Sequence, residues 1–182
     1  GLCCAGEFDA ALHQLELARE FDPGSMLVRT NLGFVFHCGR RPELAIAELA
    51  ACLALEPAFA YARYRYGLAL EAGGRREEAL AQFELLRATP GAEVHGLVGS
   101  ACGLALSGRV ADAKACVAEL LLLSERRYVS AYFLAEIFAS LGDVAEAIAW
   151  LEKAYEERAL IMPSLRNNPR FDSLRSDPRF KS

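Results

Sequence analysis

The chain has 182 residues, 53% of them hydrophobic, with a formal net charge of −4 and an isoelectric point near 5.5. A mildly acidic chain without a basic stripe lacks the electrostatic footprint of a nucleic-acid-binding protein. It contains no run of 18 or more apolar residues and no basic stretch followed by an apolar core, so we expect neither a membrane helix nor an amino-terminal signal in it. Abundant Ala and Leu, with almost no β-branched alternation, favour an all-α fold.

In chain order, apolar residues at spacings of three and four predict a series of amphipathic helices. The expected ranges are 8–20, 26–38, 42–55, 60–72, 76–88, 93–106, 110–123, 127–140 and 143–157. Pro42 fits the first turn of its helix, where a missing amide costs no hydrogen bond. Gly142 interrupts the last two helices, and the carboxylate of Asp143 is suited to cap the second of them.

An internal period of 34 residues relates these helices to one another. Five alanines mark it, each followed four residues later by a bulky apolar residue: Ala11, Ala45, Ala79, Ala113 and Ala147, then Leu15, Leu49, Phe83, Val117 and Leu151. Five residues before the alanines stand Gly6, Arg40, Gly74, Gly108 and Gly142. Small residues let two helix backbones approach closely while larger side chains fill the space around them, so the period predicts repeated helix pairs.

This pattern resembles the tetratricopeptide repeat, a 34-residue helix-turn-helix unit with small residues at fixed positions. The resemblance covers residues 1–160 and implies a right-handed superhelical solenoid of about four and a half repeats. The repeats are degenerate, because the tryptophan position of the family pattern holds Arg29, Arg63, Leu97 and Ala131. By register Gly1 falls inside the first helix of the first repeat, so we expect the chain to be a fragment of a longer protein.

The helix expected at residues 93–106 contains Gly96, Gly99 and Gly103, although glycine disfavours helix. We interpret the glycines as positions of close helix packing, with a hinge in the superhelix as the alternative.

After the repeats, residues 161–182 form a separate segment that we expect to cap the array. The tetrad Asn168-Pro169-Arg170-Phe171 recurs as Asp177-Pro178-Arg179-Phe180, and in each copy Asn or Asp can cap a short helix that begins with Pro. Phe171, Leu174 and Phe180 are expected to cover the last repeat. This ending is similar to that of repeat domains in bacterial signalling proteins, namely winged-helix regulators, serine/threonine kinases and adenylate cyclases.

No catalytic or cofactor-binding motif is present, because the chain lacks a phosphate loop, an H-E-x-x-H helix and a G-x-S-x-G elbow. The six cysteines, at positions 3, 4, 38, 52, 102 and 116, include no C-x-x-C pair. Disulfides, or a metal held by His37, Cys38 and His95, are the alternatives. We expect instead buried thiols in a reducing compartment, and hence a cytoplasmic protein without metal, cofactor or enzymatic activity.

The resemblance implies that the first helix of each pair lines a concave groove in which partner peptides lie. We predict that groove to include ten residues: Asn31, Phe34, His37, Tyr61, Tyr64, Arg65, Leu68, Tyr132, Phe133 and Glu136. Glu71 and His95 also face it in this register. Asn31 and Arg65 match two positions of the clamp by which chaperone-binding relatives hold a terminal carboxylate, whereas the lysines of that clamp have no counterpart here.

We therefore expect a non-catalytic protein-interaction module that binds a peptide, a partner protein or a missing domain of its own chain, with no nucleic acid and no membrane segment. The aromatic residues and Arg have the composition of binding hot spots, although tyrosines and phenylalanines at helical spacing also pack between repeats. Self-association through the ends of the repeat array is the alternative function.

Overall fold

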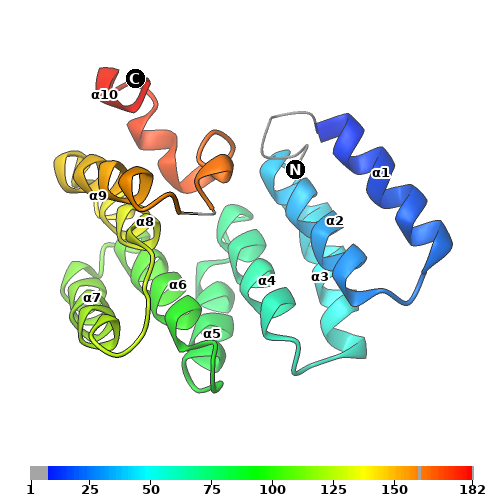
Figure 1. Cartoon of the computed structure of the whole chain (residues 1–182). Coiled ribbons are helices and arrows are strands. Elements are labelled where there is room, and N and C mark those ends of the chain that lie inside the picture. Colours follow the sequence, from blue (N-terminus) through cyan, green and yellow to red (C-terminus); the bar gives the residue numbers. More distant parts are fainter. Residues whose placement is uncertain (1–7, 160, 182) are drawn as a thin grey trace.

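The computed structural model describes residues 8–159 and 161–181 as an all-α chain of stacked helix pairs, which confirms the expected fold class (Figure 1). The α-helices are α1 (Phe8–Phe21), α2 (Met26–Cys38), α3 (Pro42–Leu55), α4 (Ala60–Ala72), α5 (Arg76–Arg87), α6 (Glu93–Leu106), α7 (Val110–Ser124), α8 (Ala131–Ser140), α9 (Val144–Glu156) and α10 (Pro178–Lys181). Two 3-10 helices, η1 (Met162–Ser164) and η2 (Pro169–Leu174), lie between α9 and α10.

Successive pairs stack where the second helix of one meets the first helix of the next, as α3 on α4 and α5 on α6, and also through their first helices. α2 packs on α4, α4 on α6 and α6 on α8, whereas α3 and α5, or α5 and α7, make at most marginal contact with each other. The array therefore curves with α2, α4, α6 and α8 on its inner side. We call the side of these four helices the inner surface.

The periodic alanines lie at the centres of the helix pairs. Ala45, Ala79, Ala113 and Ala147 are completely buried, and so are Leu49 and Phe83, which follow two of them by one turn. The core continues from pair to pair through the buried faces of neighbouring helices. A 34-residue repeat thus gives a chain of connected small cores, each completed by the next pair.

The turn between the two helices of each pair requires a left-handed backbone. Gly74, Gly108 and Gly142 have φ angles of +78°, +77° and +78°, and Arg40 adopts the same conformation with φ +60°. Arg40 therefore takes the glycine position of its repeat despite carrying a side chain. The equivalent Gly6 lies outside the described residues.

Glycines inside the helices allow neighbouring helices to touch. A Cβ atom at Gly67 or at Gly99 would lie only 2.3 or 2.2 Å from an atom of the Phe83 ring, and one at Gly96 only 2.4 Å from the backbone nitrogen of Arg87. A Cβ at Gly103 would be 3.0 Å from Leu80. The expected close packing is confirmed, since α6 sits directly on α5 at these positions.

The helix boundaries agree with the prediction to within one residue except at one place. The first helix of the last pair was expected from residue 127 but begins at Ala131. Residues 128–130 are not helical, and Ser130 has the extended backbone typical of a residue that precedes a helix. At the other end of this pair, Asp143 caps α9 as predicted, with Oδ1 accepting from the Glu146 amide at 3.2 Å.

Residues 161–181, called here the C-terminal segment, fold back onto α8 and α9 (Figure 1). Phe171 and Leu174 are completely buried there and Phe180 is partly buried, which confirms their expected position over the last repeat. Both tetrads form the predicted caps, because Asn168 Oδ1 accepts from the Arg170 amide at 3.1 Å and Asp177 Oδ1 from the Arg179 amide at 2.9 Å.

Candidate partner-binding groove

The ten predicted groove residues all lie on the inner-surface helices, but they divide into two groups by exposure. Tyr61 is exposed, whereas Asn31, Phe34, Arg65 and Phe133 are half-buried. The others are buried: His37, Tyr64, Leu68, Tyr132 and Glu136. The first group forms an open part of the inner surface, and the second group includes two residues covered by the C-terminal segment.

Arg65 is the centre of the open part. Its guanidinium carbon lies 3.8 Å from the centre of the Phe34 ring and 5.1 Å from that of Tyr61, and Nη2 donates to the Tyr61 hydroxyl at 3.3 Å. Among the described residues Arg65 has no carboxylate partner, and its buried Nε donates to no acceptor. The result is a guanidinium packed against two aromatic rings, with no carboxylate partner within residues 8–159 and 161–181.

A row of aromatic rings runs along the inner surface from Tyr64 on α4 through His95 on α6 to Phe133 on α8. Tyr64 lies 4.9 Å from His95 between ring centres, and His95 lies 5.4 Å from Phe133. Burial, with a smaller effect from Arg65, lowers the pKa of His95, so this ring is neutral at physiological pH. The predicted groove position of His95 is thus occupied by a neutral imidazole that packs as an aromatic side chain.

The C-terminal segment crosses the inner surface at α8. The Asn168 amide donates to the Tyr132 hydroxyl at 3.0 Å and to Glu136 Oε1 at 2.5 Å, and the Tyr132 hydroxyl also pairs with Ser164 Oγ at 2.9 Å. The Phe171 ring lies 5.2 Å from that of Tyr132. Tyr132 and Glu136 were predicted to contact a partner. In this structure their partner is the chain's own C-terminal segment.

Arg170 inserts deepest into the inner surface. Its Nε and Nη2 donate to the two oxygens of Glu71, each at 3.0 Å, and Nη1 donates to Glu136 Oε2 at 3.3 Å. The three side chains are between 4% and 9% exposed. Burial raises the pKa of the Glu136 carboxyl and outweighs the opposing effect of Arg170. Two acidic side chains and one guanidinium therefore share a buried site.

A second ion pair lies further along the same segment. Arg40 Nη2 is 2.7 Å from Asp172 Oδ1, which ties the end of α2 to the C-terminal segment. Asn168, Arg170 and Asp172 were not among the residues predicted for the inner surface. The repeated tetrad signalled that Asn168-Pro169-Arg170-Phe171 has a definite conformation, but it did not show where its arginine binds.

Comparison with known proteins agrees with this geometry. The sequence matches the tetratricopeptide repeat over residues 39–93 and 101–160. This chain belongs to the tetratricopeptide repeat (TPR) family. TPR repeats imply a protein–protein interaction module, and the family is typically non-catalytic.

A solved structure extends the comparison to the whole TPR array. The crystal structure of a thermophilic TPR protein from Thermus thermophilus is similar at a TM-score of 0.68 and 21% sequence identity, covering 93% of this chain and 92% of that one. At this identity the likeness shows the fold alone. A search of curated proteins found no match.

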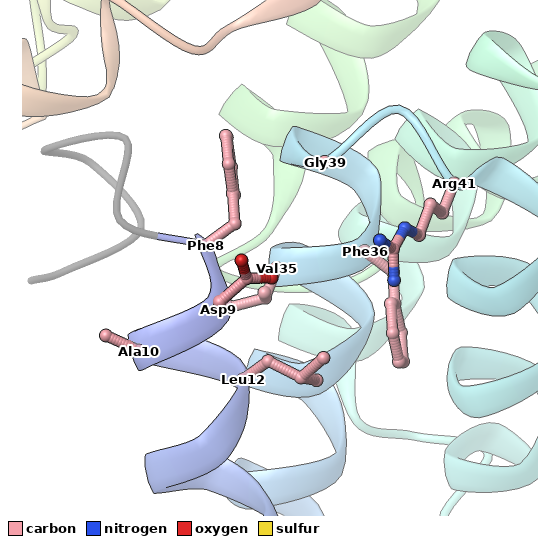
Figure 2. A pocket seen from close by; sticks show the side chains of 8 residues that line it. All are labelled: Phe8, Asp9, Ala10, Leu12, Val35, Phe36, Gly39 and Arg41. Atoms are coloured by element: carbon pink, nitrogen blue, oxygen red, sulfur yellow. The ribbon is translucent and has the colours of Figure 1, made fainter.

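The first described TPR helix leaves an open pocket against the second. The pocket has a volume of about 410 Å³. Figure 2 shows the residues that line it: Phe8, Asp9, Ala10 and Leu12 from α1, Val35 and Phe36 from α2, and Gly39 directly after α2. Arg41 comes from the turn that follows. Farther along α1, Leu17 is 37% and Phe21 90% exposed. This end of the described array therefore carries uncovered apolar side chains.

The remaining chemical alternatives concern the cysteines and a metal. Cys38, Cys52, Cys102 and Cys116 are buried as expected, and burial raises the pKa of the Cys102 thiol to about 12. Cys3 and Cys4 lie outside the described residues. Within residues 8–159 and 161–181, no three His, Cys, Asp or Glu side chains gather as a metal ion requires. None of the helices in these ranges has the length and apolarity to span a bilayer.

Proposed function

We propose that this TPR array is a non-catalytic module that docks an extended segment of a partner protein on the open part of its inner surface. The observation that carries the proposal is Arg65, stacked on Phe34 and Tyr61 without a carboxylate partner among the described residues. A partner acid brought to this guanidinium gains a charge-assisted hydrogen bond beside two apolar ring faces. Aromatic and Arg side chains of this kind dominate the energy of protein interfaces.

The neighbouring residues indicate the course of the partner segment. Asn31 precedes Phe34 by one turn on α2, and His95 and Phe133 extend the row of rings across α6 and α8. A segment lying across the four inner-surface helices would place its acidic side chain or terminal carboxylate at Arg65. Its apolar side chains would lie against His95 and Phe133.

We infer a regulatory setting for the module, in a bacterial signalling protein whose other domain or binding partner supplies the docked segment. Support comes from the ending of the chain, which resembles that of repeat domains in such proteins. This setting also accounts for a groove that combines a fixed site for an acid with residues already covered by the chain's own end.

A peptide array tests the docking surface directly. Immobilised random peptides, half with free and half with amidated carboxyl ends, are probed with the full chain and with Arg65→Ala. The wild-type chain should select acidic or free-carboxylate peptides, and Arg65→Ala should lose that selection while circular dichroism stays unchanged. Selection that survives in Arg65→Ala would place the partner elsewhere.

Arg63→Ala is the matched control for this experiment. Arg63 lies on the same helix, but its guanidinium donates to Gln82 Oε1 at 2.7 Å and to the Pro57 carbonyl, away from Phe34. This variant should keep the wild-type selection, because it removes a charge of the same sign from α4 without touching the aromatic stack.

Self-association is the second candidate function, favoured by the exposed Leu17 and Phe21 on α1. These two side chains stand four residues apart on one helix face and offer an apolar edge to a second copy. Light scattering over a concentration series should then show a dimer that Phe21→Ser dissociates. A monomer at all concentrations would remove this function.

A further inference from the structure

The site occupied by Arg170 has the properties of a specific arginine receptor. All three guanidinium nitrogens donate to carboxylate oxygens, two of them in parallel to Glu71. The guanidinium carbon also lies 5.9 Å from the centre of the Phe83 ring. A planar fork satisfies this arrangement, whereas the point charge of a lysine ammonium cannot reach both carboxylates with the same geometry.

The receptor belongs to the repeats and not to the C-terminal segment. Glu71 is on α4, Glu136 on α8 and Phe83 on α5, and each is placed by the packing of its own helix pair. Without a guanidinium between them the two buried carboxylates would face each other at a large electrostatic cost. An arginine at this point offsets that cost, whichever chain supplies it.

The second tetrad shows that the motif alone does not create the contact. In Asp177-Pro178-Arg179-Phe180 the arginine pairs with Asp177, two residues earlier, and its side chain is 55% exposed. Arg170 differs because it meets Glu71 and Glu136. The specificity thus lies in the acidic pair on the inner surface.

The neighbourhood of Arg170 also gives access to a competing ligand. A pocket of about 440 Å³ lies beside it, lined by His37, Glu71, Pro169 and Arg170 among others. The segment forms the short helix η2 here, and it is held by the hydrogen bonds of Asn168 and by the packing of Phe171 against Tyr132. A segment with a Pro-Arg-aromatic sequence would replace the contacts of Pro169, Arg170 and Phe171, so exchange would leave Glu71 and Glu136 paired with an arginine.

We propose that Glu71 and Glu136 form an arginine-recognition site, and that Arg170 is its resident occupant until a partner segment containing Pro-Arg-aromatic displaces it. This site lies apart from Arg65 and selects the opposite charge, so it goes beyond the function proposed above. Its occupation by residues 168–174 keeps this part of the inner surface closed to other ligands.

Hydrogen exchange on the wild-type chain tests displacement. The probe is a peptide with the sequence of residues 166–174, compared with the same peptide carrying neutral citrulline in place of Arg170, with Arg166 kept in both. Excess arginine peptide should speed amide exchange in residues 165–175, and the citrulline peptide should not. Unchanged exchange with the arginine peptide, or equal acceleration by both peptides, would overturn the proposal.

Direct binding to Arg170→Ala tests the receptor itself. Fluorescence anisotropy should show that the labelled arginine peptide binds this variant at least about tenfold more tightly than the citrulline peptide does. Removing one partner of a buried charge pair weakens binding by that factor or more. Adding Glu71→Gln should abolish the preference. If instead the wild-type chain forms dimers by exchanging residues 161–181 without added peptide, the resident is replaced by a second copy and the proposed partner is wrong.

Two control variants, Arg179→Ala and Arg65→Ala, separate this proposal from the function proposed above. The variant Arg179→Ala should bind neither peptide more tightly than the wild-type chain does, because Arg179 pairs with Asp177 and not with Glu71 or Glu136. Arg65→Ala should leave the arginine-peptide result unchanged. Failure of the acidic-peptide experiment therefore leaves this test intact, and the reverse also holds.

Discussion

Arg170 and Glu71 are 99 residues apart in sequence, yet they form a two-pronged ion pair with both N–O distances at 3.0 Å. The pair connects the C-terminal segment to α4, which lies two helix pairs before α8. A repeat array otherwise depends on contacts between neighbours. This ion pair therefore gives the described part of the chain a long-range link that the period does not supply.

Removing Arg170 should destabilise the chain strongly. Arg170→Ala leaves Glu71 and Glu136 buried without a cation, and we expect urea unfolding to show a loss of about 3–5 kcal/mol. The combined variant Arg170→Met, Glu71→Gln, Glu136→Gln should lose clearly less, because it buries no unpaired charge. Arg179→Ala should stay close to the wild type. An Arg170→Ala variant as stable as the wild type would show that the ion pairs do not hold the segment.

Arg40 should be better replaced by glycine than by alanine. At φ +60° an alanine keeps the strain of a left-handed backbone, about 1–2 kcal/mol, whereas glycine does not. Both variants lose the ion pair with Asp172, so their difference isolates the backbone effect. We expect the free energy of unfolding of Arg40→Gly, measured in urea, to exceed that of Arg40→Ala by about 1 kcal/mol. Equal stabilities would mean that the turn relaxes when the arginine is removed.

Gly99 should not tolerate a methyl group while Phe83 is present. A Cβ at Gly99 would lie 2.2 Å from the buried Phe83 ring, so we expect Gly99→Ala to cost about 1–3 kcal/mol in thermal or urea unfolding. In a Phe83→Ala background the cost should vanish or change sign, since alanine favours helix over glycine. Gly24→Ala is the control, because its Cβ would meet only Asp22 Oδ1 at 3.6 Å. Additive costs in the double variant would refute direct contact.

His37 should make the fold sensitive to acid. Burial, with Arg65, Arg170 and Arg40 adding repulsion, lowers its pKa from 6.5 to about 3. Between these values the unfolded chain binds the proton and the folded chain does not, so stability falls as the pH drops from 6.5 towards 3. The slope due to this group approaches about 1.4 kcal/mol per pH unit. Glu136, with its raised pKa, acts in the opposite direction.

The variant His37→Gln should reduce that slope. Urea unfolding at several pH values between 4 and 7 measures it, and the difference in slope between the variant and the wild type removes the shared contribution of the carboxylates. Identical slopes would show that His37 accepts its proton in the folded chain.

Local spacing and the 34-residue period were enough to predict the features that depend on neighbouring residues and on neighbouring repeats. Helices, turns and caps follow from local spacing, as at Asp143 and at the φ +78° of Gly142. The small-against-large pairing of Gly67 with Phe83 also recurs one period earlier at Gly33 with Leu49, because the two helices of these pairs meet in the same way. One departure was the start of α8 at Ala131, four residues later than the pattern indicated.

The groups that the inner surface offers to a partner became visible only in the folded chain. The sequence marked Tyr132, Glu136 and Arg65 as equivalent groove positions, but the structure covers the first two with residues 164–171 and leaves Arg65 between two rings. The physical reason is that charge pairing and burial depend on distance in space. No periodicity relates residue 170 to residue 71, and so the arginine receptor emerges only when the array has folded and its end has turned back on it.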